Sequence, residues 1–387
     1  MPQSLLTFAW SLVTVAASQA VAKMLDASGI YRDRVCSSWS VSANCNNLFG
    51  TTQDGKRVGA LLSDHRGGGS AARSFADGFS HSGQNTSFSA SMANVESQEW
   101  KLPLLYLYRR QLPDSGGAGR WRGGLTSEVA LTPLGVPHLV LNSTNTAGTE
   151  ASNAHGIDGG YPGAGSQVRV LRGTDTWKRI SAGTIPRNDH SCGGTIEHLP
   201  SKASGSLTQG DVLVFFAAGG GGFGDPLDRE PERVANDVAS GWVTQEHAKE
   251  LYGVVVAPAG HVDATATAAR REAIRGERKQ QACVSWNAQD HCEHPSQASH
   301  EPWRVGENVE LESSGALRCR RCKQVLSGPN GRVAVAQQPL RRANPWMALR
   351  HGGDSPNFVL EELSCPDCAT LISVREVRRG SEARKGT

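Results

Sequence analysis

Apolar side chains recur every three or four positions near the start of the chain. Residues 4 to 28 are therefore predicted to form one helix with an apolar face, ended by Gly29. Ser and Thr interrupt the run, and no positive charge precedes it, so neither a membrane span nor a signal peptide is indicated. We expect a buried helix whose packing partner lies upstream in a longer protein or on another chain. The face comprises Leu5, Phe8, Leu12, Val15 and Ala16.

Short apolar runs separated by turn residues predict a β-rich region from residue 102 to residue 225. An earlier strand is expected at Val58–Leu62, followed by a glycine loop at 65–69. The segments Gly119–Gly123 and Gly219–Gly224 are interpreted as tight turns, since neither has the Lys-Ser/Thr ending of a phosphate-binding P-loop. The expected later strands are Leu104–Tyr108, Glu128–Leu131, Pro137–Leu141, Gln167–Leu171 and Val212–Phe216.

Helical patterns return after residue 228. One helix is expected over 229–240, with Pro231 in its first turn, and a second begins at the N-cap Thr244 and ends at Gly253. A closing strand is expected at Val254–Val256. The Ala-, Arg- and Glu-rich residues 259–282 then indicate a charged helical linker.

These patterns predict an α+β fold with a β-rich, glycine-punctuated domain, peripheral helices and a separate C-terminal zinc ribbon. The expected division is a body over 1–258, the linker over 259–282 and a tail domain over 283–387. With 44 glycines among 387 residues, turns are favoured over long helices.

Composition excludes some classes of partner. A net charge of +3 for this length gives no reason to expect nucleic acid or an anionic membrane as a partner. Nine cysteines, four of them in two Cys-x-x-Cys pairs, fit a metal site in a reducing compartment better than a disulfide framework. A cytoplasmic location is therefore expected.

The two Cys-x-x-Cys pairs carry the clearest chemistry. Cys319–Cys322 and Cys365–Cys368 each place two thiolates in one turn, and together they supply four soft ligands for a tetrahedral Zn²⁺. Apolar residues on both sides of the second pair predict a hairpin that holds it. The sequence therefore predicts a structural zinc ribbon, with no open position for a catalytic water.

Other candidates are weaker. His65 and His81 lie near glycine loops but have no paired carboxylate motif, so loop residues are the simpler interpretation. Cys36 and Cys45 are interpreted as ordinary thiols. A looser cluster is an alternative ligand set or a second metal site, although its spacing fits no ribbon pattern; it consists of Cys283, His291, Cys292 and His294.

Three motifs carry a family resemblance. The segment from Gly219 to Pro226 (GGGGFGDP), continued by REPERV at 229–234 and GWVT at 241–244, resembles the C-terminal signature of hydantoinase B/oxoprolinase proteins. The segments DSGGAGRWRGG at 114–124 and HGIDGGYPG at 155–163 match two further motifs of that family. The signature residues proper are Gly219, Gly220, Gly221, Gly222, Gly224, Asp225 and Pro226. The tail from about residue 283 resembles the small zinc-binding subunit of acetone and acetophenone carboxylases.

The resemblance implies a subunit of an ATP-dependent multi-subunit enzyme. A hydantoinase A-type partner would bind ATP and activate a carbonyl or amide oxygen by phosphorylation. The family's metal-binding motif, a DPY-x-GGTH-like stretch, belongs to the N-terminal half of full-length B subunits and does not occur here. The chain is therefore expected to correspond to the C-terminal half. ATP and a catalytic divalent metal are expected on partner subunits, one of which would supply the missing half.

Three functions remain open at this stage. The first is a carboxylase subunit of the acetone/acetophenone type, because a B-type body is joined to a carboxylase-like zinc module. The second is a subunit of a hydantoinase or 5-oxoprolinase-type hydrolase of cyclic amides. The third is a non-catalytic assembly subunit. The resemblance transfers no catalytic residue to this chain, and activity of the chain alone is not expected.

Overall fold

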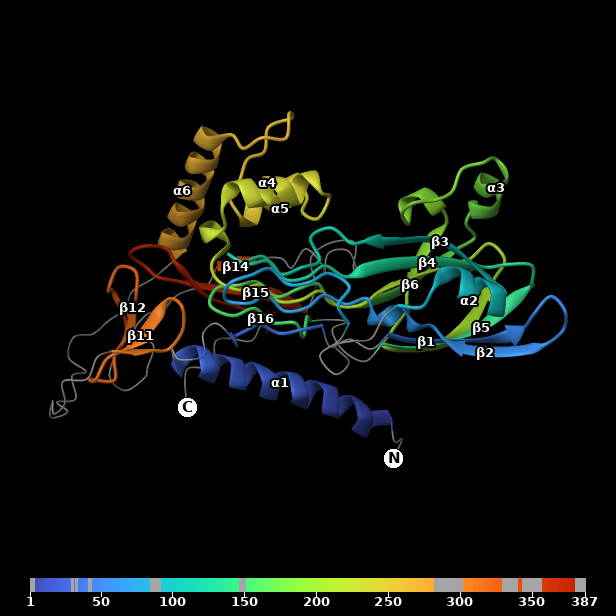
Figure 1. Cartoon of the computed structure of the whole chain (residues 1–387), viewed down its shortest axis with the longest axis horizontal. Coiled ribbons are helices and arrows are strands. Elements are labelled where there is room, and N and C mark those ends of the chain that lie inside the picture. The colour runs from blue at the N-terminus through green and yellow to red at the C-terminus, as the bar shows by residue number, and fades with distance from the viewer. Residues whose placement is uncertain are drawn as a thin grey trace.

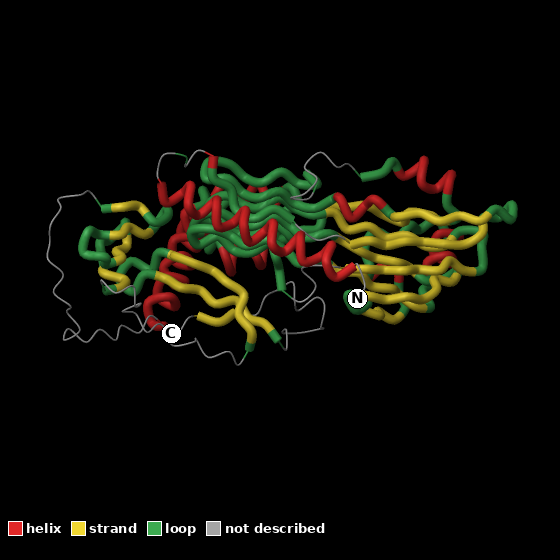
Figure 2. Tube along the Cα trace, turned by 90° about the horizontal axis from the view of Figure 1, so that it is seen from below, coloured by secondary structure: helices red, strands yellow, loops and turns green. Residues whose placement is uncertain are grey.

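The molecule is elongated, with a β-sandwich at one end, a bundle of glycine-rich segments in the middle and a cysteine-bearing ribbon at the other end (Figures 1 and 2). The computed structural model describes residues 4–28, 31, 34–40, 44–83, 92–145, 151–281, 302–328, 340–342 and 357–379. Its sheets are antiparallel and its helices lie around them, so the predicted α+β class is confirmed.

The sandwich consists of a five-stranded and a four-stranded sheet. The strand orders are β3-β4-β9-β6-β7 and β2-β1-β5-β8. The predicted strands in this region are all present, although the sequence pattern did not predict β1, β7, β8 or the short helices α2 and α3. The bounds are β1 Asn44–Thr51, β2 Arg57–Leu61, α2 Val95–Lys101, β3 Leu104–Gln111, β4 Ser127–Pro133, β5 His138–Asn145, β6 Gln167–Arg172, α3 Thr176–Ser181, β7 Thr195–His198, β8 Lys202–Thr208 and β9 Val212–Phe216.

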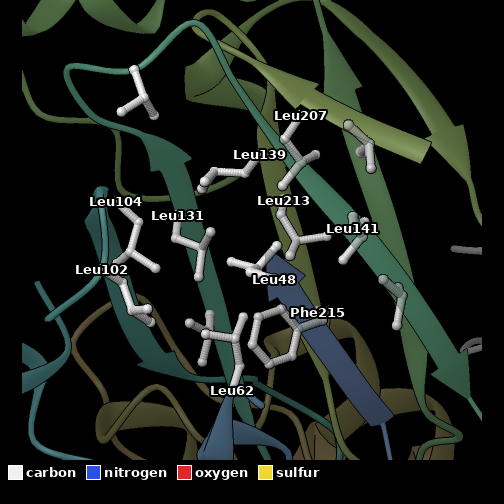
Figure 3. Packing of buried hydrophobic residues seen from close by; sticks show 14 residues of the cluster. Leu48, Leu62, Leu102, Leu104, Leu131, Leu139, Leu141, Leu207, Leu213 and Phe215 are labelled. Carbon is white, nitrogen blue, oxygen red and sulfur yellow. The ribbon is translucent and has the colours of Figure 1, made fainter. Parts of the chain in front are cut away.

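Leucine side chains from both sheets fill the space between them (Figure 3). Strand β5 alternates exposed and buried positions, as expected for a strand with one face on the core. Each fully buried leucine contributes on the order of 1.5–3 kcal/mol of hydrophobic stabilisation. The labelled members of this core are Leu48, Leu62, Leu102, Leu104, Leu131, Leu139, Leu141, Leu207, Leu213 and Phe215.

Strand β9 is buried on both faces. Leu213 and Phe215 face the leucine core, whereas Val212 and Val214 belong to a second apolar cluster that includes Leu171. This explains its unbroken run of apolar residues. The strand leads directly into residues 217–224, so the sandwich anchors the glycine signature.

The glycine-rich segments run side by side as extended chains through the middle of the molecule (Figure 2). In the segment 219–224, successive backbone N–H groups donate to different neighbouring segments. Positions 219 and 222 donate to the same segment, as do positions 220 and 223, whereas 221 and 224 donate to Ser38 and Ile157. Three residues per turn without internal hydrogen bonds is the repeat of a polyproline II-type helix. The donors and acceptors are Gly219 to Ala164 (3.0 Å), Gly222 to Tyr161 (2.9 Å), Gly220 to Gly124 (3.0 Å), Phe223 to Trp121 (2.9 Å), Gly221 to Ser38 (2.9 Å) and Gly224 to Ile157 (3.0 Å).

Close packing of backbone on backbone explains the glycines. A Cβ on Gly219 would lie 1.7 Å from the carbonyl oxygen of Ser115, and one on Gly220 would lie 1.8 Å from that of Ser70. The segments around these positions contribute glycines that are packed in the same way. They include Gly69, Gly116, Gly117, Gly123, Gly124, Gly156 and Gly160.

The interpretation of Gly219–Gly224 as a tight turn is therefore wrong. The segment 119–123 does turn back on its own chain, since the Gly123 N–H donates to the Gly117 carbonyl oxygen at 2.9 Å. Of the glycines in these two segments, only Gly224 has a positive φ, of +77°. The N–H groups of residues 219–224 all donate to distant segments of the chain, so they are not available to cradle a phosphate. Glycine is required here mainly because it has no side chain. Its freedom to adopt turn conformations matters less.

Helices cover the bundle on two sides. The helices α4 (Pro231–Ala239), α5 (Gln245–Leu251) and α6 (Ala264–Gln281) agree with the patterns predicted after residue 228. Pro231 begins α4, and the Thr244 hydroxyl accepts a hydrogen bond from the His247 backbone N–H at the start of α5. Arg229, which is 2% exposed, donates to both Asp77 and Asp237 and so links α4 to the bundle.

The predicted strand Val254–Val256 does not form. The Val254 N–H donates to Ala248 at the end of α5, and the Val255 N–H donates to the Thr267 hydroxyl of α6. Because the connecting helices use these amides, only an isolated bridge from Val256 to Val262 remains.

Helix α1 (Ser4–Ser28) confirms the predicted helical span and lies along one side of the bundle (Figures 1 and 2). Its Ala22 packs with Ile157 and Phe223, but Val21 and Met24 are 53% and 71% exposed. Of the predicted apolar face, the side chains of Leu5, Phe8, Leu12 and Val15 lie outside the described residues and Ala16 is exposed, so burial of this face against another chain or an upstream segment stays a prediction. None of the helices in the described ranges is long and apolar enough to cross a bilayer.

The bundle predicts a strong and selective effect of methyl groups. We expect Gly220→Ala to lower the free energy of unfolding by at least about 3 kcal/mol, because its Cβ would collide with a fixed carbonyl group. The matched control is Gly276→Ala in α6, where an added Cβ meets no atom within 4 Å. That change should stabilise the helix by about 1 kcal/mol. Equal stability of the two variants in chemical denaturation would contradict the packing.

Candidate metal centre

Two equivalent turns present the predicted cysteines. The first lies between β12 (Leu317–Cys319) and β13 (Val325–Ser327), and the second between β15 (Phe358–Ser364) and β16 (Leu371–Arg378). In each turn the residue after the second cysteine has a positive φ, 64° at Lys323 and 59° at Ala369. Its N–H donates to the carbonyl oxygen of the first cysteine, at 2.8 and 2.9 Å respectively. This closure turns both sulfur atoms of a pair in the same direction.

The two turns bring the four sulfur atoms together. Cys319 Sγ lies 3.6 Å from Cys368 Sγ, Cys322 Sγ lies 3.5 Å from Cys365 Sγ, and all four atoms are within 4.8 Å of one another. Tetrahedral bonds of about 2.3 Å to a zinc ion separate its sulfur ligands by about 3.8 Å. The spacing therefore fits a four-coordinate metal ion of that size, and the predicted hairpin around the second pair is confirmed.

The environment favours the thiolate form of Cys319, whereas burial raises the pKa of Cys322 to about 11. Hydrogen bonding with Cys365 lowers the pKa of Cys319 to about 5, and the same contact raises the pKa of Cys365. Cys319 and Cys365 are fully buried, and Leu326 lies against them. A metal ion would hold all four sulfurs as thiolates and leave no open position, so its chemical contribution would be to fix the two turns together.

Basic residues around the first turn contact carboxylates and carbonyl groups. Arg321 donates to Asp228, Lys323 lies 2.9 Å from Glu310, and Arg318 pairs with Glu312. These contacts hold the ribbon to itself and, through Asp228, to the body. The remaining strands of the ribbon are β10 Trp303–Arg304, β11 Val309–Leu311 and β14 Leu340–Arg342.

The signature carboxylate Asp225 connects the bundle to the second turn. Its Oδ2 accepts hydrogen bonds from the Leu371 N–H at 2.8 Å and from Arg278 Nη1 at 2.8 Å. Arg278 of α6 is 2% exposed and also donates to the carbonyl oxygen of Ala369, at 3.1 Å. Apolar packing continues this contact, because Leu360 and Leu371 share a buried cluster with residues of α4 and α5.

This link was not predicted from the sequence. Asp225 belongs to the recognised signature, but its partner Arg278 lies in a segment interpreted as a linker. Arg278 is one of several arginines in that helix, and nothing in the helix pattern distinguishes the buried one. The contact between Tyr161 of the HGIDGGYPG motif and Glu362 of the ribbon was also missed, because the two residues are far apart in sequence and no local pattern pairs them.

The other predicted candidates do not join this centre. His81 hydrogen-bonds the Gly67 backbone, and burial lowers its pKa. Burial raises the pKa of the Cys36 and Cys45 thiols, which are free of disulfides. The side chain of His65, and the cluster of Cys283, His291, Cys292 and His294, lie outside the residues that the structure describes. Within the described ranges, the four cysteines are the only group of three or more His, Cys, Asp or Glu side chains placed to hold a metal ion.

The geometry predicts one bound metal ion per chain. Cys365→Ser should remove it, because three thiolates and a hydroxyl bind a soft divalent ion far more weakly than four thiolates. The measurement is metal content of the purified chain by mass spectrometry. Cys192→Ser, at a buried cysteine in the sandwich, is the matched control and should keep the metal. Metal-free wild-type chain under reducing conditions would contradict this assignment.

The link through Asp225 predicts a slower release of that metal than in a detached ribbon. Asp225→Asn leaves the buried Arg278 without its counter-charge, a change that costs about 3–5 kcal/mol. We expect metal transfer to a chromogenic chelator to be at least tenfold faster in this variant. Asp228→Asn breaks only a part-exposed ion pair and should change the rate less than twofold. Unchanged release from Asp225→Asn would show that the centre is independent of the bundle.

Known proteins resemble this chain over the sandwich and the bundle. The family model for hydantoinase B/oxoprolinase matches residues 6–226, which ends at the last residue of the signature. The alpha subunit of acetone carboxylase from Xanthobacter autotrophicus is 31% identical over 233 residues, which is 54% of this chain and 29% of that subunit. The beta subunit of caprolactamase from Pseudomonas jessenii is 30% identical over 206 residues, or 53% of this chain and 32% of that subunit.

Comparison with solved structures finds the same two kinds of relative. The nucleotide-free structure of acetone carboxylase, which carries out ATP-dependent acetone carboxylation, superposes with a TM-score of 0.60 and 27% identity over 66% of this chain and 35% of that chain. The ATP-dependent caprolactamase of Pseudomonas jessenii superposes with a TM-score of 0.50 at 24% identity, covering 62% and 38% of the two chains, and so shares the fold. The chain thus spans about a third of the length of these relatives. Because the family model matches more than half of the sequence, the chain belongs to the hydantoinase B/oxoprolinase family.

Proposed function

We propose that this chain is a subunit of an ATP-dependent carboxylase of the acetone/acetophenone type. The observation that carries the proposal is the joint likeness to acetone carboxylase, in sequence to its alpha subunit and in structure with a TM-score of 0.60. The delta subunit of acetophenone carboxylase from Aromatoleum aromaticum is also similar, at 30% identity over 42% of this chain and 25% of that subunit. The four-cysteine ribbon, which resembles the small subunit of such carboxylases, supports the same assignment.

In this proposal the chain contributes structure, and its partners contribute the activating chemistry. A hydantoinase A-type subunit binds ATP, a second chain supplies the N-terminal half of the B subunit, and the catalytic divalent metal belongs to these partners. The metal of the four-cysteine centre is zinc, held by Cys319, Cys322, Cys365 and Cys368. Its role is to fix the ribbon against the signature glycines through Asp225. The complex is cytoplasmic.

The similarity to caprolactamase favours a second candidate, a subunit of an ATP-dependent hydrolase of cyclic amides. A hydantoinase or 5-oxoprolinase-type hydrolase would use the same kind of complex. The likeness is weaker in both comparisons, with lower identity and a TM-score of 0.50. A non-catalytic assembly subunit is the third candidate, supported by the absence of a second metal-ligating cluster in the described ranges.

A reconstituted complex distinguishes the candidates. The chain would be co-expressed with the two partner subunits and supplied with labelled bicarbonate, and incorporation into acetone or acetophenone would be followed with and without ATP. The proposal predicts ATP-dependent uptake of label that is lost when this chain is omitted. Opening of caprolactam or hydantoin with no uptake of bicarbonate would overturn it in favour of the hydrolase. Full carboxylation by the partners without this chain would contradict the proposal.

A further inference from the structure

A cavity of about 690 Å³ lies where α1, the segment 155–159 and the ribbon meet. This volume is within the range of pockets that bind small molecules. Charged side chains line it from all three elements, namely Lys23 and Asp26 from α1, Asp158 from the segment and Arg375 from β16. Arg375 is already paired with Glu361 at 2.5 Å, and the imidazole of His155 completes the polar lining. The cavity is distinct from the four-cysteine centre, and the proposed function does not use it.

Asp26 marks one end of the cavity with an unsatisfied acceptor. The residue is 1% exposed, and its Oδ1 has no hydrogen-bond donor in the part of the chain that the structure describes. Arg304 forms an ion pair with this oxygen at 3.6 Å, which is too long for a hydrogen bond, and the same guanidinium nitrogen donates to Glu307 at 3.0 Å. A buried carboxylate oxygen without a hydrogen-bond donor destabilises the protein, because its lost contacts with water are not replaced. A ligand with a strong N–H donor would satisfy it.

The carboxylate of Asp158 adds a second acidic group at the Asp26 end of the cavity. A Cβ on Gly306 would lie 2.5 Å from Asp158 Oδ1 and 3.7 Å from Asp26 Oδ2, so both carboxylates converge on the same point of the ribbon. Gly306 leaves room for them because it has no side chain. This arrangement favours a cationic group, such as a primary ammonium, over a neutral donor.

A positively charged side chain lies about one helical turn from Asp26. Lys23 precedes Asp26 by three residues, a rise of about 4.5 Å along the helix. Its ammonium group has no ion-pair or hydrogen-bond partner among the described residues, and it lies near enough to His155 to help lower the pKa of that imidazole, after the larger effect of burial. Lys23 and the neutral His155 together suit a carboxylate. Between the two ends, Ile157, Val309 and Ile372 provide apolar wall.

We propose that this cavity binds an amino carboxylate, with the ammonium group on Asp26 and Asp158, the carboxylate on Lys23 and His155, and a short aliphatic chain against the apolar wall. Hydrogen bonds to charged groups are the stronger kind, and two opposite charges at fixed separation select for length as well as charge. The ribbon forms one side of the cavity through Val305, Gly306 and β16, so the site is complete only when the ribbon is docked.

Calorimetric titration of the full chain tests the proposal. The probes are glycine, 4-aminobutyrate and 6-aminohexanoate, with hexanoate and hexylamine as analogues that carry only one of the two charges. At least one amino carboxylate should bind with a Kd at least tenfold lower than those of both one-ended analogues. Asp26→Asn should weaken that binding at least tenfold and leave hexanoate unchanged. Lys23→Met should weaken it and leave hexylamine unchanged.

Lys178→Met is the matched control, because this lysine is exposed on α3 at the far end of the molecule (Figure 1). It should not alter any of the affinities. Absence of binding by all three amino carboxylates at millimolar concentration would overturn the proposal, as would binding that neither variant weakens. Lys23 is exposed on its helix, so its variant remains informative even if Asp26→Asn fails to fold. Because the titration needs no partner subunit and no turnover, its failure is separate from failure of the proposed carboxylase function.

Discussion

Packing of backbone directly against backbone is the constraint on which this structure depends. Most chains keep neighbouring segments apart with side chains, and the hydrogen bonds of a sheet lie in one plane. In the bundle, the segment 219–224 bonds in three directions to segments that are distant in sequence. Carbonyl oxygens occupy the positions where side chains would stand, so each addition of a methyl group has to move several chains at once. Stability here comes from satisfied, buried backbone groups more than from apolar contacts.

This constraint links the parts of the molecule. Strand β9 enters the bundle from the sandwich core, and the same continuous stretch leaves it at Asp225 to hold Arg278 and the ribbon. A rigid bundle therefore fixes how the four-cysteine centre lies relative to the sandwich. The cavity beside α1 depends on the same arrangement, because the segment 155–159 is part of the bundle and the ribbon closes its other side. Formation of the cavity thus requires the same docking of the ribbon that the Asp225 contacts stabilise.

Sequence patterns predicted the elements that obey local rules. The alternating and apolar runs predicted six of the nine sandwich strands, all except β1, β7 and β8, and Pro231 and Thr244 placed α4 and α5. The Cys-x-x-Cys spacing identified the four sulfur atoms that converge, because each turn is local and the chemistry of thiolates is specific. The resemblance of Gly219–Pro226 to a family signature was also confirmed.

The rest depends on partners far apart in sequence, which local patterns cannot supply. The run of glycines at 219–222 indicates a turn and an extended, packed segment equally well, until the chains at 121–124 and 161–164 are placed beside it. The burial of Arg278 follows from a carboxylate 53 positions earlier in the chain. The strand expected at 254–256 does not form, because the Val254 N–H donates to Ala248 of α5 and the Val255 N–H donates to the Thr267 hydroxyl of α6.

Amide hydrogen exchange measured by mass spectrometry tests the account most directly, because it asks whether the glycine-rich segments behave as loops or as a bonded core. The account predicts that peptides covering 115–124 and 217–224 exchange as slowly as β4 and β9, although they contain no regular helix or strand. Exchange of these peptides at the rate of the exposed turn at 52–56 would contradict it. In that case the glycines would be flexible connections, and the docking of the ribbon through Asp225 would lose its support.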